Sequence, residues 1–371
     1  MTQGPIRVVG PGAHMRRSSH CTARKPVVIS ASSICILGGY GDVGLRVAGL
    51  LHAQTQARLL LVGRDAKRAD TAALSIGPRC RGLALDARDQ DAAARLAEAA
   101  LCVNLTEATP PALAADLISN GTHFIDSSAS PAYVADLEKT INALPGPRAT
   151  AVLEAGLAPG LTNLLAARMC EQHPDTRNID ILLELGMGTP HGLEATAWTL
   201  QALGRTYPMK SDGIWHEIRT GAISRHFTNG AENILGIGFA FSDQRSIARD
   251  LDLAGARTFL AISPGWMTRV LRWLGRGPLR HVLRRNAMAA ARIMQHLPTL
   301  GSKGTRLIIE GRNAQGKVIG MHHFSSGPQS DLTAGVIAQL ALALMSPSTD
   351  PRRGLQPLGT FVDPASFAER M

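Results

Sequence analysis

The chain contains 371 residues, 45% of them hydrophobic, and carries a formal net charge of +10 at pH 7. A chain of this length and apolar content can bury the cores of two domains, and it has no apolar run long enough to span a bilayer. Its five cysteines form no Cys-x-x-Cys pair, so we expect a reduced, cytoplasmic protein without a metal site.

The positive charge is concentrated in two segments. Residues 1–30 hold five basic and no acidic side chains, and residues 264–306 hold nine basic and no acidic ones. The rest of the chain contains 25 basic and 29 acidic residues and is therefore mildly acidic. We expect no nucleic-acid partner, because no recognition motif or aromatic platform accompanies the charge. Residues 1–32 are expected to form a basic, disordered extension.

Residues 34–44 form an apolar strand pattern that runs into a glycine-spaced turn, and a helix pattern follows. The glycines stand in the G-x-G-x-x-G register. In this motif the first glycine allows a tight turn, the second admits a pyrophosphate, and the third lets the helix pack closely on the sheet. Because the strand and the helix flank the glycines, the pattern predicts a dinucleotide site. The residues assigned to the site are Gly39, Tyr40, Gly41, Asp42, Val43 and Gly44.

A second apolar run, residues 57–62, is followed by Arg64. At this position, about twenty residues beyond the glycines, an acid accepts a hydrogen bond from the ribose of NAD, whereas an arginine pairs with the 2′-phosphate of NADP. Arg64 therefore favours NADP, and the adjacent Asp65 keeps NAD as the alternative.

Four more short apolar runs follow at the spacing of a doubly wound sheet, at residues 82–85, 101–105, 123–125 and 150–153. Buried parallel strands have this composition, and their carboxyl ends line the ligand crevice. The polar residues that follow are candidates for this crevice, although Thr, Asp and Ser after a strand are more often helix caps. Asp86, Thr106 and Ser127 are assigned to the cofactor, and Asp126 and Glu154 are candidate general acids.

Residues 156–165 read Gly-Leu-Ala-Pro-Gly-Leu-Thr-Asn-Leu-Leu. With the glycine turn and the Asp126-Ser127-Ser128 strand end, this segment resembles the saccharopine dehydrogenase-like oxidoreductases in order and spacing. The resemblance implies an α/β protein with an N-terminal NAD(P)-binding Rossmann domain, a doubly wound parallel sheet, at residues 33–156. It also implies a second, α+β domain for substrate and dimerisation at residues 157–325, and a helix at residues 326–371 that returns to the first domain before a tail.

The resemblance further implies hydride transfer between a nicotinamide and a carbon–nitrogen bond of a small amino-acid-like metabolite. Lysine-pathway members carry an acid where this chain has Ala158, and an Asp-His pair where it has Thr162 and Asn163. The loss of these acids argues against saccharopine itself, and Thr162 and Asn163 are expected to contact substrate. A carbonyl reductase, and a dinucleotide-binding or membrane-associated protein without catalysis, are the alternatives.

In the second half of the chain, residues 179–185 and 257–262 are expected strands, residues 306–312 and 317–324 an expected hairpin, and residues 331–345 the returning helix. The turn at residues 186–192 precedes another helix, and the resembling family places such a turn beside substrate. His191 and Thr196 are therefore candidate substrate contacts, and His191 is the third candidate general acid.

The basic segment, residues 264–306, is expected to contain two short helices within residues 266–285, the second starting at Pro278. Arginines recur there at three- and four-residue steps between tryptophans and aliphatic side chains. Three interpretations remain open: a lid or dimer surface, a cationic wall for an acidic substrate, or a face that binds an anionic membrane. The expected partners are a small-molecule substrate and a second copy of the chain.

Overall fold

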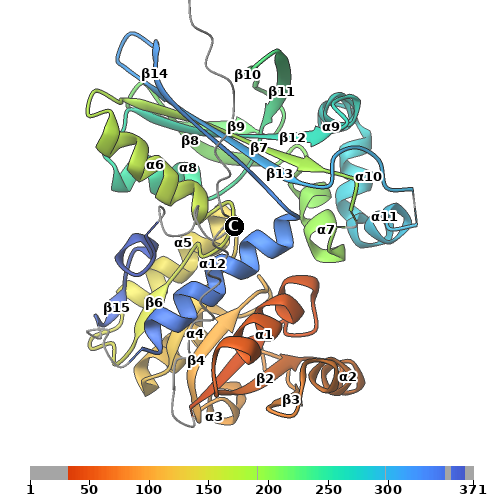
Figure 1. Cartoon of the computed structure of the whole chain (residues 1–371), viewed down its shortest axis with the longest axis vertical. Coiled ribbons are helices and arrows are strands. Elements are labelled where there is room, and N and C mark those ends of the chain that lie inside the picture. Colours follow the sequence, from red (N-terminus) through yellow and green to blue (C-terminus); the bar gives the residue numbers. More distant parts are fainter. Residues whose placement is uncertain (1–31, 190, 297, 347–351, 364–371) are drawn as a thin grey trace, which may run out of the picture.

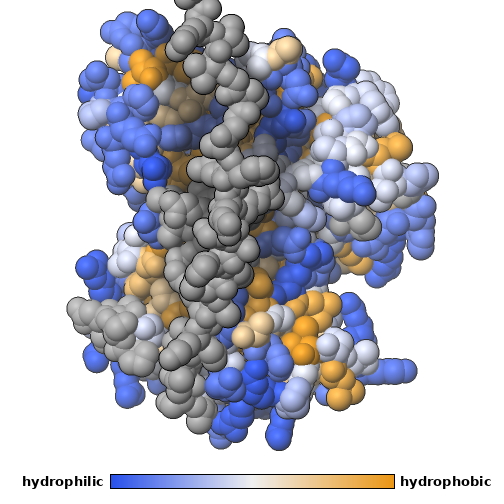
Figure 2. Space-filling view, viewed as in Figure 1, coloured by the Kyte–Doolittle hydropathy of each residue, from blue (hydrophilic) through white to orange (hydrophobic). Residues whose placement is uncertain are grey.

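The computed structural model describes residues 32–189, 191–296, 298–346 and 352–363. Two sheets with helices packed against them form two lobes (Figure 1). The lobe coloured red to yellow contains a parallel sheet, and the lobe coloured green to blue contains a mixed sheet. Hydrophilic side chains cover much of both lobes on the face shown in Figure 2. The basic extension expected at residues 1–32 lies outside the described residues, except for Ser32.

The first sheet has seven parallel strands in the order β15-β6-β5-β4-β1-β2-β3. The chain builds outward from β1 in both directions, which is the doubly wound arrangement. Its strands are β1 (Ser33–Leu37), β2 (Arg58–Gly63), β3 (Cys80–Ala84), β4 (Ala99–Asn104), β5 (His123–Asp126), β6 (Thr150–Val152) and β15 (Gly354–Leu355). Its helices are α1 (Asp42–Gln54), α2 (Ala66–Ile76), α3 (Ala92–Arg95), α4 (Pro111–Asn120) and α5 (Pro131–Asn142). The predicted fold class is confirmed.

One strand of this sheet could not be expected from the sequence. β15 comes from the end of the chain and pairs with β6 through Gly354 and Leu355. Two residues carry no alternation of apolar and polar positions, so the pattern that revealed the other strands is absent here.

The second sheet has β7 (Asn178–Gly186) and β12 (Gly255–Ser263) paired in parallel at its centre, with antiparallel strands around them. The predicted hairpin is present as β13 (Thr305–Arg312) and β14 (Val318–Ser326). Four strands were not predicted: β8 (Thr206–Ser211), β9 (Ile214–Arg219), β10 (Ser224–Asn229) and β11 (Glu232–Gly238). They are short, and β9 is exposed at five of its six positions, so their apolar signal is weak.

The helices of this part are α6 (Leu161–Gln172), α7 (Leu193–Ala202), α8 (Asp243–Asp250), α9 (Trp266–Arg276), α10 (Leu279–Arg285) and α11 (Ala287–Met294). The two short helices expected in the basic segment are present as α9 and α10, with Pro278 as the N-cap of α10. α11 is a third, unpredicted helix of the segment.

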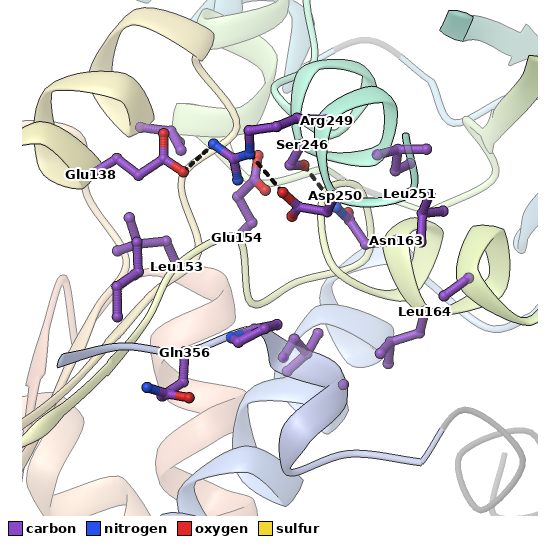
Figure 3. Close-up of a pocket in the computed structure, with 17 residues that line it drawn as sticks. Glu138, Leu153, Glu154, Asn163, Leu164, Ser246, Arg249, Asp250, Leu251 and Gln356 are labelled. Carbon is purple, nitrogen blue, oxygen red and sulfur yellow. Dashed lines mark hydrogen bonds and ion pairs between the residues drawn. The ribbon is translucent and has the colours of Figure 1, made fainter. Parts of the chain in front are cut away.

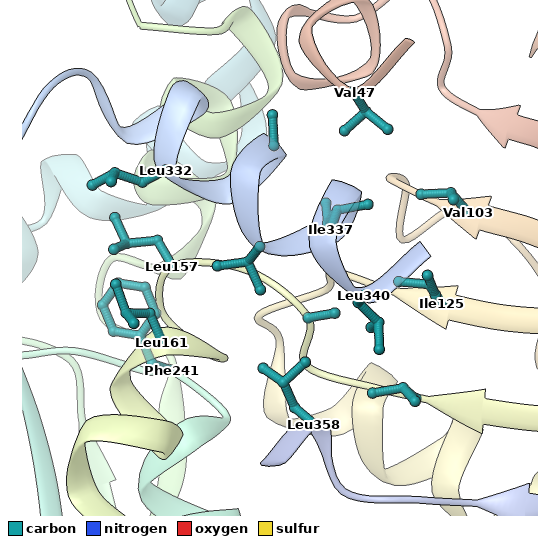
Figure 4. Packing of buried hydrophobic residues seen from close by; sticks show 14 of the residues in the cluster. Val47, Val103, Ile125, Leu157, Leu161, Phe241, Leu332, Ile337, Leu340 and Leu358 are labelled. Atoms are coloured by element: carbon teal, nitrogen blue, oxygen red, sulfur yellow. The ribbon is translucent and has the colours of Figure 1, made fainter. Parts of the chain in front are cut away.

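The returning helix is α12 (Gln329–Leu344), which lies between the two lobes (Figures 1 and 4). It packs against α1, and its buried Ile337 and Leu340 join a core that contains Val103 and Ile125 of the parallel sheet. Leu157 and Leu161 of the chain entering the second lobe belong to the same cluster. One continuous apolar core therefore fixes the carboxyl edge of the first sheet against the second lobe.

Among the described residues, no helix combines the length and the hydropathy that crossing a bilayer requires.

Candidate functional site

The glycine turn joins β1 to α1 at the carboxyl edge of the parallel sheet. The left-handed residue of the turn is Gly38, with φ +80°, one position before the glycine expected to make it. Gly39 is instead needed for packing, because a Cβ there would lie 2.8 Å from Leu61 Cα of β2. A Cβ on Gly44 would lie 2.5 Å from Gly38 O, which explains why α1 can start so close to β1.

Gly41 differs from Gly39 and Gly44 because the space that a Cβ would occupy there is largely open. A Cβ at this position would meet one atom within 4 Å, Gly38 O at 3.1 Å. Gly41 is also the N-cap of α1, and no side chain caps this helix. The first turn of α1 therefore presents backbone amides beside an open approach, the arrangement that binds a phosphate anion.

Asp42 begins α1, but its carboxylate is directed to the protein. It accepts hydrogen bonds from Arg46 and from Ser330, just inside α12, and Arg46 also pairs with Asp331. The Asp42 side chain, which was expected to contact the cofactor, thus links α1 to α12. Only the backbone of Asp42 is left to contribute to the glycine turn. Val43, the next residue, is half-buried and packs against the main core.

Basic side chains gather at the ends of β2 and β3. Arg64 is exposed directly after β2, and Asp65 caps α2 by accepting from Arg68 N at 3.0 Å. The ring of Tyr40 lies beneath the Arg68 guanidinium, 4.4 Å from its carbon. Asp86 hydrogen-bonds Arg88 at 2.6 Å, which holds its pKa well below the usual range, with Arg64 adding a smaller effect. Asp65 and Asp86 are therefore already engaged, while Arg64 faces solvent.

The ends of β4 and β5 are joined by a buried polar network. Asp126 is fully buried, and it accepts from Asn104 Nδ2 at 2.6 Å and from Ser128 N at 2.9 Å. Burial raises its pKa to about 7. Ser127 donates to Asn104 O, and Thr106 accepts from Ala108 N as a turn cap. With no exposed surface, Asp126 is placed to hold the two loops together and cannot reach a substrate as the structure stands.

A cross-lobe contact near this network was not foreseen. Glu107 accepts from Ser130 N at 3.0 Å and from the Ser130 hydroxyl, and Trp198 Nε1 of α7 donates to the same hydroxyl at 2.9 Å. Trp198 packs against Phe239 and Phe241 at ring distances of 5.5 and 5.4 Å. Residues distant in sequence make this contact, so no local pattern could have revealed it.

A cavity of about 370 Å³ lies beyond the end of β6, between α5, α6, α8 and the segment around β15 (Figure 3). Glu154 points into it, and its Oε1 is buried without a hydrogen-bond partner among the described residues. Burial raises the pKa of Glu154 to about 7, and its backbone is held at φ +59°, a conformation that costs energy for a residue with a side chain. Glu154 is thus the candidate acid that both lines a cavity and has a pKa near neutrality.

Asn163 lines the same cavity, so the structure brings it together with Glu154. It accepts from Gly160 N at 3.0 Å and donates to Ser246 Oγ at 2.8 Å. Across the cavity, Arg249 pairs with Glu138 and Asp250. Leucines from three elements supply an apolar wall.

Thr162 does not share this position. It is fully buried, and its hydroxyl donates to Asp243 Oδ2 at 2.8 Å, while Thr258 donates to the other oxygen at 2.7 Å. Burial raises the pKa of Asp243 to about 6. The expectation that Thr162 contacts substrate is not met by this geometry, because its side chain links α6 to α8 and β12.

His191 and Thr196 lie at the start of α7, away from the cavity. His191 Nε2 is 3.0 Å from Gly186 O, and the Thr196 hydroxyl donates to Gly192 O at 3.1 Å within its own helix. A Cβ on Gly192 would lie 3.5 Å from Asp42 Cβ, so this turn faces the glycine turn of the first lobe. His191 therefore precedes α7 in a turn that faces the glycine turn, and it does not line the Glu154 cavity, while the Thr196 hydroxyl bonds within its own helix.

The two sheets and their connection define the class of fold, that of the two-domain α/β dehydrogenases. The structure is similar to apo saccharopine dehydrogenase (L-Glu forming) from Saccharomyces cerevisiae, with a TM-score of 0.59 and 14% identity, over 90% of this chain and 96% of that one. A weaker likeness is to an engineered D-amino acid dehydrogenase, with a TM-score of 0.44 and 12% identity, over 89% of this chain and 93% of that one. Another is to C. glutamicum DAP dehydrogenase in complex with DAP, with a TM-score of 0.41 and 12% identity, over 88% of this chain and 92% of that one.

No family model matches the chain, and no curated protein matches its sequence. At 14% identity the likeness to the yeast enzyme shows a shared fold. It agrees with the resemblance noted from the motifs at the level of architecture.

Proposed function

We propose that this protein is an NADP-dependent oxidoreductase that transfers hydride to or from a carbon–nitrogen bond of a small amine. The observation that carries the proposal is the glycine turn, in which Gly41 leaves an open approach to uncapped helix amides at the carboxyl edge of a doubly wound sheet. The fold shared with an amino-acid dehydrogenase supports the same class of reaction.

The residues present fit a dinucleotide with a 2′-phosphate. The first turn of α1 would hold the pyrophosphate, and Arg64 would pair with the 2′-phosphate beside the Tyr40–Arg68 stack. When bound, the nicotinamide supplies or accepts the hydride. Loops after β4 and β5, held by Asp126 and Glu107, would position the ring between the lobes.

In this proposal Glu154 exchanges the proton at the substrate nitrogen. Glu154 lines a cavity whose apolar wall and paired charges suit a small amine with a hydrocarbon body, and its buried Oε1 has no hydrogen-bond partner among the described residues. A protonated Glu154 would donate to the nitrogen as the carbon–nitrogen bond is reduced, and accept a proton in the reverse direction. Asn163 would orient the substrate at the rim of this cavity.

The test combines binding and turnover on the full chain. We expect tighter binding of NADPH than of NADH, with the preference narrowed or reversed in Arg64→Asp. NADPH oxidation is then followed with carbonyl compounds supplied with and without amines. Consumption that requires the amine supports imine reduction. Consumption with the carbonyl alone identifies a carbonyl reductase, and binding without consumption identifies a non-catalytic dinucleotide-binding protein.

The role of Glu154 has its own control. Glu154→Gln should lower kcat at least about a hundredfold while leaving NADPH affinity unchanged. Glu138→Gln removes a carboxylate from the same cavity, but one that is paired with arginines, and it should keep most of the activity. Because the acid must carry its proton, kcat for reduction should fall as pH rises through about 7. If kcat of Glu154→Gln has the same pH dependence as that of the parent, another group supplies the proton.

A further inference from the structure

The helices α9, α10 and α11 pack along one side of the upper lobe and are fixed on their inner sides (Figure 1). Leu271 is buried, and the Thr268 hydroxyl accepts from Ile262 N of β12 at 2.8 Å. α10 and α11 both pack on α7. These helices are therefore a firmly attached part of the fold, and their outer sides have a defined direction.

The outer side of α9 carries a stripe of large apolar side chains. Trp266, Val270 and Trp273 recur at four- and three-residue steps, which places them on one helix face. Trp266 is 51% exposed and Trp273 64% exposed. On α10, Leu279 and Val282 are exposed as well. Proteins that stay free in water rarely expose a contiguous stripe of this kind, so it marks an interaction surface.

Arginines lie beside this stripe. α9 and α10 contain six of them and no acid: Arg269, Arg272, Arg276, Arg280, Arg284 and Arg285. Within the described ranges, none of the six forms an ion pair with a carboxylate. Figure 2 shows hydrophobic and hydrophilic residues mixed on this side, to the right of the view. Arg269, Arg276 and Arg285 are exposed, whereas Arg272 Nε is buried and Arg280 Nη1 donates to two backbone carbonyls. The exposed arginines make this apolar surface positively charged.

We propose that the outer face of α9 and α10 is a docking surface for an anionic lipid bilayer. Tryptophan and aliphatic side chains would enter the boundary between headgroups and acyl chains, while the arginines bind lipid phosphates. The proposal rests on exposure and charge at this face, and does not depend on the enzymatic proposal above.

Two other occupants fit the face less well. A two-fold contact with a second copy would set the exposed Arg269, Arg276 and Arg285 against the same arginines of that copy, with no acid in these helices to neutralise them. A nucleic-acid duplex would neutralise the arginines but would press Val270, Leu279 and Val282 against a charged backbone. An anionic bilayer satisfies the apolar and the basic side chains together.

The test is co-sedimentation of the full chain with vesicles of equimolar phosphatidylglycerol and phosphatidylcholine, compared with vesicles of phosphatidylcholine alone. We expect binding to the anionic vesicles only, weakened by high salt. Each surface arginine contributes about fivefold, so Arg269→Gln with Arg276→Gln should weaken binding about twenty-fivefold. Arg58→Gln with Arg81→Gln removes the same charge from exposed positions of the parallel sheet and should leave binding unchanged.

Tryptophan emission reports the orientation. Trp266 and Trp273 should shift to shorter wavelength on binding, whereas Trp198 is already packed among phenylalanines. The shift should disappear in Trp266→Phe with Trp273→Phe, while sedimentation persists because phenylalanine is also apolar. Failure to bind anionic vesicles, or equal loss of binding in both arginine pairs, would overturn the proposal. So would a dimer that shields both tryptophans without vesicles, or arginine-dependent binding of duplex DNA in place of vesicles.

Discussion

Substitution of Gly41 by valine tests the link between the fold and the cofactor most directly. Among the three glycines of the motif, an added Cβ clashes with backbone at Gly39 and Gly44 but meets only Gly38 O, at 3.1 Å, at Gly41. The backbone there has φ −77° and ψ 169°, which a valine adopts without strain. The variant should therefore fold, with its added side chain in the space that the pyrophosphate would occupy.

The two effects can be sized separately. Loss of glycine at the N-cap of α1 should cost about 1 kcal/mol of unfolding free energy. Displacing the pyrophosphate removes two or three hydrogen bonds from backbone amides to a charged group, each worth about 1.5–3 kcal/mol. Binding should therefore weaken by at least about a hundredfold, far beyond the stability change.

NADPH affinity by calorimetry and unfolding by circular dichroism measure these two quantities on the same samples. Gly49→Ala is the matched control, because Gly49 lies in the same helix and a Cβ there meets nothing within 4 Å. It should raise the unfolding free energy by up to about 1 kcal/mol and leave binding unchanged. A folded Gly41→Val protein with the affinity of the parent would refute the dinucleotide assignment.

Three further predictions concern polar groups that are buried or half-buried. Because burial raises the folded pKa of Asp126 from 3.8 to about 7, its contribution to stability is complete below pH 4 and is lost as pH rises through 7. Asp126→Asn should remove this pH dependence, which amounts to up to about 4 kcal/mol of unfolding free energy between pH 4 and 8. If urea titrations give the variant the same pH dependence as the parent, the prediction is wrong. Asp180 is fully buried beneath Arg225, Arg257 and Arg312, so Asp180→Asn should cost about 3 kcal/mol of unfolding free energy, and a loss below 1 kcal/mol would show that the network is dispensable. Asn163→Ala should raise KM several-fold without changing NADPH affinity, and unchanged kinetics would reduce Asn163 to a helix cap.

Local pattern was sufficient for six of the seven strands of the first sheet, β15 being the exception. Most of these strands are buried apolar runs, and each is followed by small or polar residues, so periodicity and glycine spacing placed the strands and the turn before α1. The likeness of the Pro159-Gly160 segment to a known family indicated the two-lobe architecture that the structure confirms. The returning helix was visible as a long apolar run and is present as α12.

Tertiary structure decided what each polar residue does. The sequence placed Asp126, Glu154, Thr162 and Asn163 near strand or helix ends, but burial separates them: Asp126 and Thr162 are enclosed by partners, while Glu154 and Asn163 share a cavity. That cavity needs α8 and the segment around β15, which are distant in the chain. Likewise, the basic composition of residues 264–306 is plain in the sequence, whereas the outward direction of Trp266 and Trp273 depends on which side of α9 packs against β12. Strand and helix propensity arise from neighbours along the chain, but access to solvent, pKa and the orientation of a surface arise from neighbours in space.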